Sequence, residues 1–282
     1  MKNPEYILGI IGGCFPVQEQ IKHDELYHQL IAHQLLYESG IILNIKISRY
    51  DLVKECDDAF NNIISNGIPD LLLFHVRPDP YLINSKVYAR FVNKNKIKTS
   101  KINLHKFSGF KEPELIAVNN QDFSGRKKRK HYLRKIFREL NYIAGIISGN
   151  NLITTNKFVE TIYFLKSKCE DRKIKLVVQG PPSRPRSKME NYLLNKLNKK
   201  LFTRFLNTDI EYIPCFGEYD EDGNYIFLED DIHLSSLGHK KIAGLLYPII
   251  KKYFPNKKYS VFLPPVEVEC SLRNPDLSGR GL

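Results

Sequence analysis

Two residues near the C-terminal end of the chain have the spacing of half a catalytic triad. Asp230 precedes His233 by three residues, and an amphipathic helical pattern follows directly. On a loop that leads into a helix, a carboxylate and an imidazole at this spacing can share one pocket. The carboxylate can then orient the ring as a general base. The pair predicts a nucleophile–histidine–aspartate site whose nucleophile comes from elsewhere in the chain.

Cys14 is the candidate for that nucleophile. It follows Gly12-Gly13 at the end of an apolar run over residues 6–11, and Pro16 can occupy the first turn of a following helix. The amino end of a helix stabilises a thiolate through its dipole and free N–H groups, and a nearby imidazole does so further. The alternative is that Cys14 is a small residue packed in a tight turn.

The remaining cysteines predict no other chemistry. Cys56, Cys169, Cys215 and Cys270 are dispersed without a C-x-x-C spacing, which argues against a disulfide framework and against a structural zinc site. We expect no metal and no cofactor. His75 lies in an apolar run and is expected to be a hydrogen-bonded core residue, and His239 is expected to be structural.

The elements that must position these residues alternate between strands and helices. Such alternation predicts an open α/β sandwich of the flavodoxin-like type, with three layers and a central parallel sheet of about five strands. Strands are expected over residues 6–11, 41–48, 70–76, 173–179 and 211–215, and helices over residues 17–38, 51–65, 131–147, 157–168, 189–206 and 237–253.

Positive charge is concentrated in one part of the chain. The formal net charge is +12, and residues 94–138 contain 14 Lys or Arg but only 3 Asp or Glu. We expect an insertion over about residues 93–130, after the third strand, within an α/β domain of residues 1–254. Residues 255–282 are expected to form a peripheral tail. The basic segment is either a solvated insertion or a landing surface for an anionic partner.

The N-terminal residues lack the apolar stretch and small-residue cleavage site of a signal peptide, and no run of 18 uncharged apolar residues occurs. These two features predict a cytoplasmic protein without a membrane span.

The motifs together resemble the SGNH/GDSL family of hydrolases, which includes esterases, lipases, thioesterases and carbohydrate O-acetylesterases. The resemblance covers about residues 5–253. Its most specific part is the segment from Asp230 to Ser235, which is similar to the family's D-x-x-H block, with Asp231 where a glycine is common. Gly180-Pro181-Pro182 is also similar to the family's pattern.

The other blocks of this family are altered here. Its G-D-S motif falls on Gly12-Gly13-Cys14, so the resemblance implies a thiol nucleophile in place of a hydroxyl. The glycine of the second block falls on Arg49, whose backbone N–H would remain an oxyanion donor. The asparagine of the third block falls at or near Pro78, which has no N–H. Arg77 is the substitute, because its charged fork can stabilise an oxyanion.

The resemblance implies a hydrolase or acyltransferase that cleaves an ester or thioester through Cys14, His233 and Asp230 by way of an acyl-enzyme. The substrate would be a small molecule, a carbohydrate ester or an acyl carrier. The main alternative is a catalytically degenerate protein of the same fold that binds an anionic ligand or partner.

Two further classes of function are disfavoured. Residues 126–130 could contact nucleic-acid phosphates, but no nucleic-acid-binding signature accompanies them. A dinucleotide site is disfavoured because the first turn lacks G-x-G-x-x-G.

Overall fold

Five parallel strands form the central layer of the protein. The computed structural model describes residues 3–83, 139–140, 142–143, 145–147 and 149–254. The strands are β1 (Glu5–Gly12), β2 (Ile42–Arg49), β3 (Leu71–His75), β4 (Lys175–Gln179) and β5 (Glu211–Ile213). Their order in the sheet is β2-β1-β3-β4-β5, and every neighbouring pair is parallel. This confirms the predicted flavodoxin-like arrangement, whose strand order reverses at β1 and β3.

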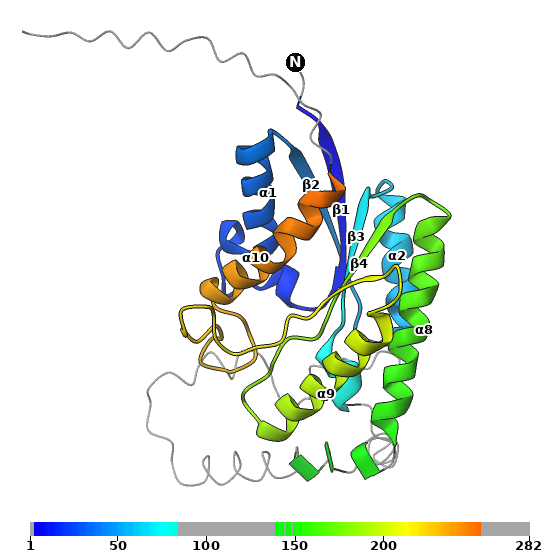
Figure 1. Cartoon of the computed structure of the whole chain (residues 1–282), viewed down its shortest axis with the longest axis vertical. Helices are drawn as coiled ribbons and strands as arrows, with labels where there is room; N and C mark the ends of the chain where they lie inside the picture. The colour runs from blue at the N-terminus through cyan, green and yellow to red at the C-terminus, as the bar shows by residue number, and fades with distance from the viewer. Residues whose placement is uncertain (1–2, 84–138, 141, 144, 148, 255–282) are drawn as a thin grey trace, which may run out of the picture.

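Helices cover both faces of the sheet (Figure 1). One face is packed by α1 (Tyr27–Ser39) and α10 (Ser236–Tyr253), and the other by α2 (Cys56–Ser65), α8 (Asn150–Glu170) and α9 (Lys188–Phe205). A short helix, α3 (Pro78–Ile83), follows β3. β3 is buried along its whole length, as expected for a strand covered on both faces. Apolar side chains from both faces therefore fix the strand ends that carry the candidate site.

The first long helix begins ten residues later than the sequence pattern predicts. Pro16 lies in only a one-turn 3₁₀ helix, Phe15–Val17, and α1 starts at Tyr27. The chain between them is held by a tertiary contact, because the buried Gln18 side chain donates a 2.7 Å hydrogen bond to the carbonyl of Leu234. The prediction of a helix from residue 17 is therefore wrong. The prediction that the dipole of a long helix acts on Cys14 is therefore wrong as well.

The remaining predicted elements occur close to their expected positions. The strand at 211–215 is shorter than predicted, and the helix at 157–168 is longer, because α8 begins at Asn150. The predicted basic insertion, most of the predicted helix at 131–147 and the tail at 255–282 lie outside the described residues. None of the helices within the described ranges combines the length and apolar character that a membrane crossing requires.

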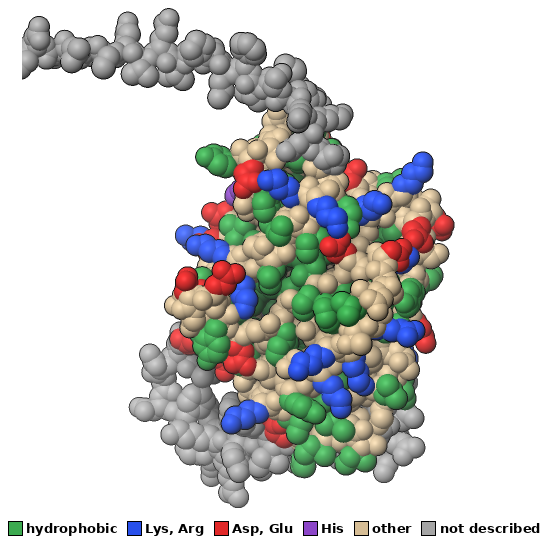
Figure 2. Space-filling model, viewed as in Figure 1, with side chains coloured by type: hydrophobic (Ala, Val, Ile, Leu, Met, Phe, Trp, Pro, Cys, Tyr) green, Lys and Arg blue, Asp and Glu red, His purple; other side chains and the backbone are tan. Residues whose placement is uncertain are grey.

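Figure 2 shows the surface above α9, where Lys and Arg side chains gather. The exposed positions of this helix include Lys196, Lys199, Lys200 and Arg204. Positive charge is thus present on the described surface as well as in the sequence of residues 94–138.

Candidate active site

The loop before α10 is built so that Asp230 holds His233. Oδ1 of Asp230 accepts hydrogen bonds from the backbone N–H groups of Ile232 and His233, each at 2.9 Å. Its other oxygen, Oδ2, lies 2.5 Å from Nδ1 of the His233 ring. One carboxylate therefore fixes both the turn and the imidazole.

Residues within this loop and directly after it stabilise its conformation. Asp231 has φ 55°, in the left-handed region that favours glycine and tolerates Asp. Ser235 caps α10 by accepting from the N–H of Gly238, and a Cβ at Gly238 would lie 2.3 Å from the carbonyl of Ile226. The small residue that follows the D-x-x-H block therefore permits the close approach of α10 to residue 226.

Cys14 lies beside His233, although 219 positions separate the two in the sequence. Its side chain is partly exposed, and its thiol is close enough to the imidazole for each group to shift the pKa of the other. Because Asp230 occupies Nδ1, the other ring nitrogen is the one left for the thiol. The structure thus brings together Cys14, His233 and Asp230.

The ionisation of Cys14 and His233 is linked. Burial raises the pKa of the Cys14 thiol, but the hydrogen bond and positive charge of His233 outweigh it, and the net pKa is lowered. Burial lowers the pKa of His233, but its hydrogen bonds to Asp230 and Cys14 prevail, so its pKa is raised. Both shifts favour a thiolate–imidazolium pair. His233 therefore provides the stabilisation of the thiolate that we expected from a helix dipole.

The two residues expected to stabilise an oxyanion occupy different environments. Arg49 is the last residue of β2, opposite Gly12 of β1, and its exposed side chain lies 3.4 Å from Oδ1 of Asp51. Arg77 is 5% exposed. It contacts the carbonyl of Tyr50 and the Asp51 carboxylate through Nη1, and donates through Nη2 to Oδ2 of Asp79 at 3.1 Å.

Arg184 and Asp79 are parts of this site that we did not predict. Arg184 is 4% exposed and donates through Nη1 to Oδ1 of Asp79 at 2.7 Å. Burial raises the pKa of Asp79, but the charges of Arg184 and Arg77 outweigh it and hold this pKa well below its usual range. The sequence does contain a signal for a charged residue at this edge of the sheet, because two arginines flank Pro185 soon after the end of β4.

Other titratable residues are accounted for by packing. The ring of His75 is buried, with Nε2 2.6 Å from the Tyr27 hydroxyl, and Nδ1 of the buried His239 lies 3.3 Å from the backbone N of Tyr27. Both are structural, as expected. Among the described residues, no group of three or more His, Cys, Asp or Glu side chains is arranged to hold a metal ion.

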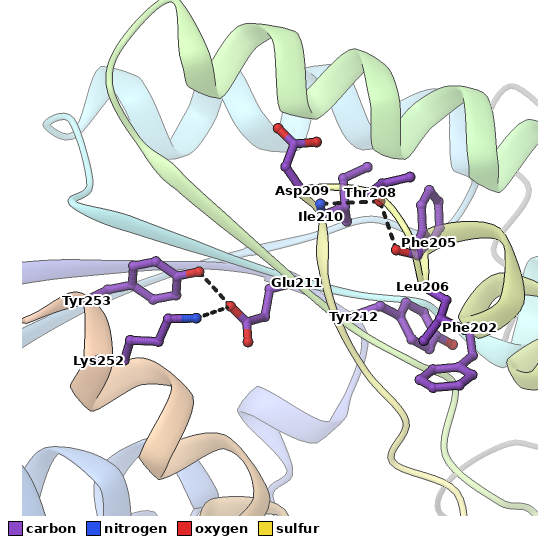
Figure 3. A pocket seen from close by; sticks show the side chains of 10 residues that line it. All are labelled: Phe202, Phe205, Leu206, Thr208, Asp209, Ile210, Glu211, Tyr212, Lys252 and Tyr253. Carbon is purple, nitrogen blue, oxygen red and sulfur yellow. Dashed lines mark hydrogen bonds and ion pairs between the residues drawn. The ribbon is translucent and has the colours of Figure 1, made fainter.

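A cavity of about 400 Å³ lies elsewhere, at the start of β5 (Figure 3). Glu211 on its wall accepts hydrogen bonds from Lys252 and Tyr253, and the aromatic rings of Phe202 and Tyr212 lie on another side. Its lining contains neither cysteine nor histidine. The chemistry at Cys14, at the opposite ends of the strands, is therefore the better candidate for an active site.

Solved structures share the fold. An acetylxylan esterase from Geobacillus stearothermophilus is 11% identical to this chain, with a TM-score of 0.52 over 89% of this chain and 96% of the esterase. A lipase/acylhydrolase from Enterococcus faecalis is 9% identical, with a TM-score of 0.50 over 91% of this chain and 100% of the other. No protein-family model matches the sequence, and no curated protein shows significant sequence similarity to it. The chain has an SGNH-like α/β fold, the fold that its motifs led us to expect.

Proposed function

We propose that this protein is an ester or thioester hydrolase, or an acyltransferase, that works through a covalent acyl-enzyme on Cys14. The observation that carries the proposal is that the His233 ring contacts the Asp230 carboxylate at 2.5 Å and also lowers the pKa of the Cys14 thiol. A nucleophile next to a base that is itself oriented by a third group is the recurring arrangement for acyl transfer. The shared fold with an acetylxylan esterase and a lipase/acylhydrolase is compatible with this chemistry.

The reaction would proceed in two halves. The Cys14 thiolate attacks the carbonyl carbon, an S–C bond forms, and the carbonyl π electrons move onto oxygen. When the tetrahedral intermediate collapses, the bond to the leaving alkoxide or thiolate breaks and His233 donates it a proton. In the second half His233 removes a proton from water or an acceptor, which attacks the thioester and releases Cys14 as a thiolate. Asp230 keeps the ring oriented throughout.

The oxyanion would be stabilised by donors at the carboxyl ends of the strands. These are the backbone N–H groups of Cys14 and Arg49 and the guanidinium of Arg77. A charged donor at this position compensates for Pro78, which lies where the family has an asparagine and lacks an N–H.

Positive charge would help to collect the substrate. The basic sequence of residues 94–138 and the exposed cations of α9 favour an anionic acyl donor, polymer or carrier. This part of the proposal requires that KM for an anionic ester rise with ionic strength, while KM for a neutral ester of the same acyl group stay constant.

The decisive experiment compares turnover of short p-nitrophenyl esters and thioesters by wild type, Cys14→Ser and Cys14→Ala. We expect Cys14→Ala to abolish turnover and Cys14→Ser to retain a small fraction. Mass spectrometry of a quenched reaction should show the acyl group on Cys14. Wild-type turnover in Cys14→Ala would disprove the mechanism. A protein that shows neither turnover nor labelling of Cys14 by iodoacetamide would instead be a binding protein of this fold.

A further inference from the structure

A single carboxylate joins two buried arginines next to the candidate nucleophile. Asp79 accepts from Arg77 through Oδ2 and from Arg184 through Oδ1. Arg77 comes from the loop after β3 and Arg184 from the loop after β4, and these two strands are neighbours in the sheet. Asp79 therefore links the carboxyl ends of two strands at the edge of the sheet where Cys14 follows β1.

Arg77 lies directly against the turn that carries Cys14. A Cβ at Gly13 would lie 2.7 Å from Nε of Arg77 and 3.1 Å from its Cδ, closer than side-chain contacts allow. Glycine at position 13 thus leaves the space that this guanidinium occupies. Nε of Arg77 therefore lies against the residue that directly precedes Cys14.

Among the described residues, the Nε–H groups of both arginines lack a hydrogen-bond acceptor. The hydrogen bonds of Arg77 use its backbone N–H and its two terminal nitrogens, and none within the described ranges uses Nε. Nε of Arg184 is buried and has no hydrogen-bond acceptor in the described part of the chain. A buried donor without an acceptor is costly, and a substrate oxygen can relieve that cost.

We infer that Asp79 is a positioning residue, which holds Arg77 and Arg184 so that their Nε–H groups receive the oxyanion of the acyl-transfer reaction. The inference rests on the proposed function and adds two residues to it. It explains how the site works without the asparagine of the third family block. Two guanidiniums held by carboxylates replace one neutral amide. The terminal nitrogens of Arg77 contact Asp51 and Asp79, and Nη1 of Arg184 contacts Asp79 and Glu190. These contacts restrain the positions of both guanidinium groups.

The test uses the full-length protein with Asp79→Asn, which keeps the side-chain shape but removes the one carboxylate that both arginines share. We expect kcat for a p-nitrophenyl ester to fall by about 10²-fold, the typical effect of losing an oxyanion donor, with KM little changed. Alkylation of Cys14 by iodoacetamide, measured at a pH at which the thiol is fully ionised, should keep its wild-type rate. This displacement reaction forms no oxyanion.

Arg184→Lys provides a second, independent variant, because it retains the charge but loses the Nε–H group. It should show the same loss of kcat with the same retention of alkylation. The matched control is Asp57→Asn, which removes a carboxylate that pairs with Lys168 between α2 and α8. That variant should keep the wild-type kcat.

The inference is overturned if folded Asp79→Asn and Arg184→Lys proteins turn over the ester at the wild-type rate. It is also overturned if both lose alkylation together with turnover, because Asp79 would then merely support the local structure. These results differ from failure of the proposed function, in which wild-type protein itself shows no Cys14-dependent turnover.

Discussion

Gly13 and Arg77 lie so close together that the Cβ of any larger residue at position 13 would be 2.7 Å from Nε of the arginine. We therefore expect Gly13→Ala to displace the guanidinium. The variant should lose about 1–3 kcal/mol of unfolding free energy through overpacking. It should also lose tenfold or more in kcat, because a displaced oxyanion donor costs up to about 10²–10³-fold. Urea denaturation and ester kinetics on the same preparation measure both effects.

Gly244→Ala is the matched control for this substitution. Gly244 lies within α10, and a Cβ there meets nothing within 4 Å in the described part of the chain. Because alanine favours the helix over glycine by roughly 1 kcal/mol, this variant should be at least as stable as wild type and equally active. Equal kcat values for Gly13→Ala and Gly244→Ala would show that the position of Arg77 has no effect on catalysis.

The pairing of Cys14 with His233 predicts how thiol reactivity depends on pH. In wild type the thiol pKa is lowered because His233 outweighs the effect of burial. The alkylation rate should reach half its maximum below about pH 8.5, the ordinary pKa of cysteine. In His233→Ala the imidazole no longer lowers the thiol pKa, and burial is the largest remaining effect, so the midpoint should move above that value. Iodoacetamide labelling over a range of pH, followed by peptide mass spectrometry, measures both midpoints. His33→Ala, at an exposed position on α1, should match wild type; coincident curves for wild type and His233→Ala would exclude the pairing.

The Asp79–Arg184 pair predicts two opposite shifts in the same measurement. The carboxylate of Asp79 raises the pKa of Cys14, whereas the guanidinium of Arg184 lowers it. Asp79→Asn should therefore move the midpoint of alkylation to lower pH, and Arg184→Gln should move it to higher pH. General loosening of the site would shift both variants in the same direction. Midpoints that move together would therefore contradict this electrostatic arrangement.

The sequence was sufficient to predict Asp230 and His233 as a pair because their relationship is local. They lie three positions apart in one turn, and the carboxylate that orients the ring also accepts hydrogen bonds from the backbone of the turn. The place of Cys14 just after the carboxyl end of β1 could be predicted because an apolar run and two glycines precede it. In parallel sheets, such ends meet at one edge.

Arg184 could not be connected with Asp79 by the same reasoning. The two residues are 105 positions apart in the sequence. They meet because β3 and β4 are neighbours in the sheet, and a hydrophobic pattern does not reveal the order of strands. The late start of α1 has a similar cause. Helical spacing of apolar residues is a local signal, and it was overridden by the contact between Gln18 and Leu234, which are 216 positions apart. Long-range polar contacts thus account for the principal errors.

The buried histidine of β3 predicts that the protein loses stability in mild acid. Burial lowers the pKa of His75 to about 3, whereas an unfolded histidine titrates near 6.5. Between these pH values the unfolded chain binds the proton and the folded protein does not, so unfolding free energy falls as pH decreases. This contribution is complete above pH 6.5 and declines below it, by up to about 1.4 kcal/mol per pH unit. In His75→Gln, which keeps a polar partner for the Tyr27 hydroxyl, the free energy of unfolding should depend less steeply on pH between 4 and 6.5. Urea denaturation at several pH values measures the slope, with the exposed His33→Gln as control. An unchanged slope in His75→Gln would show that His75 does not contribute to acid sensitivity.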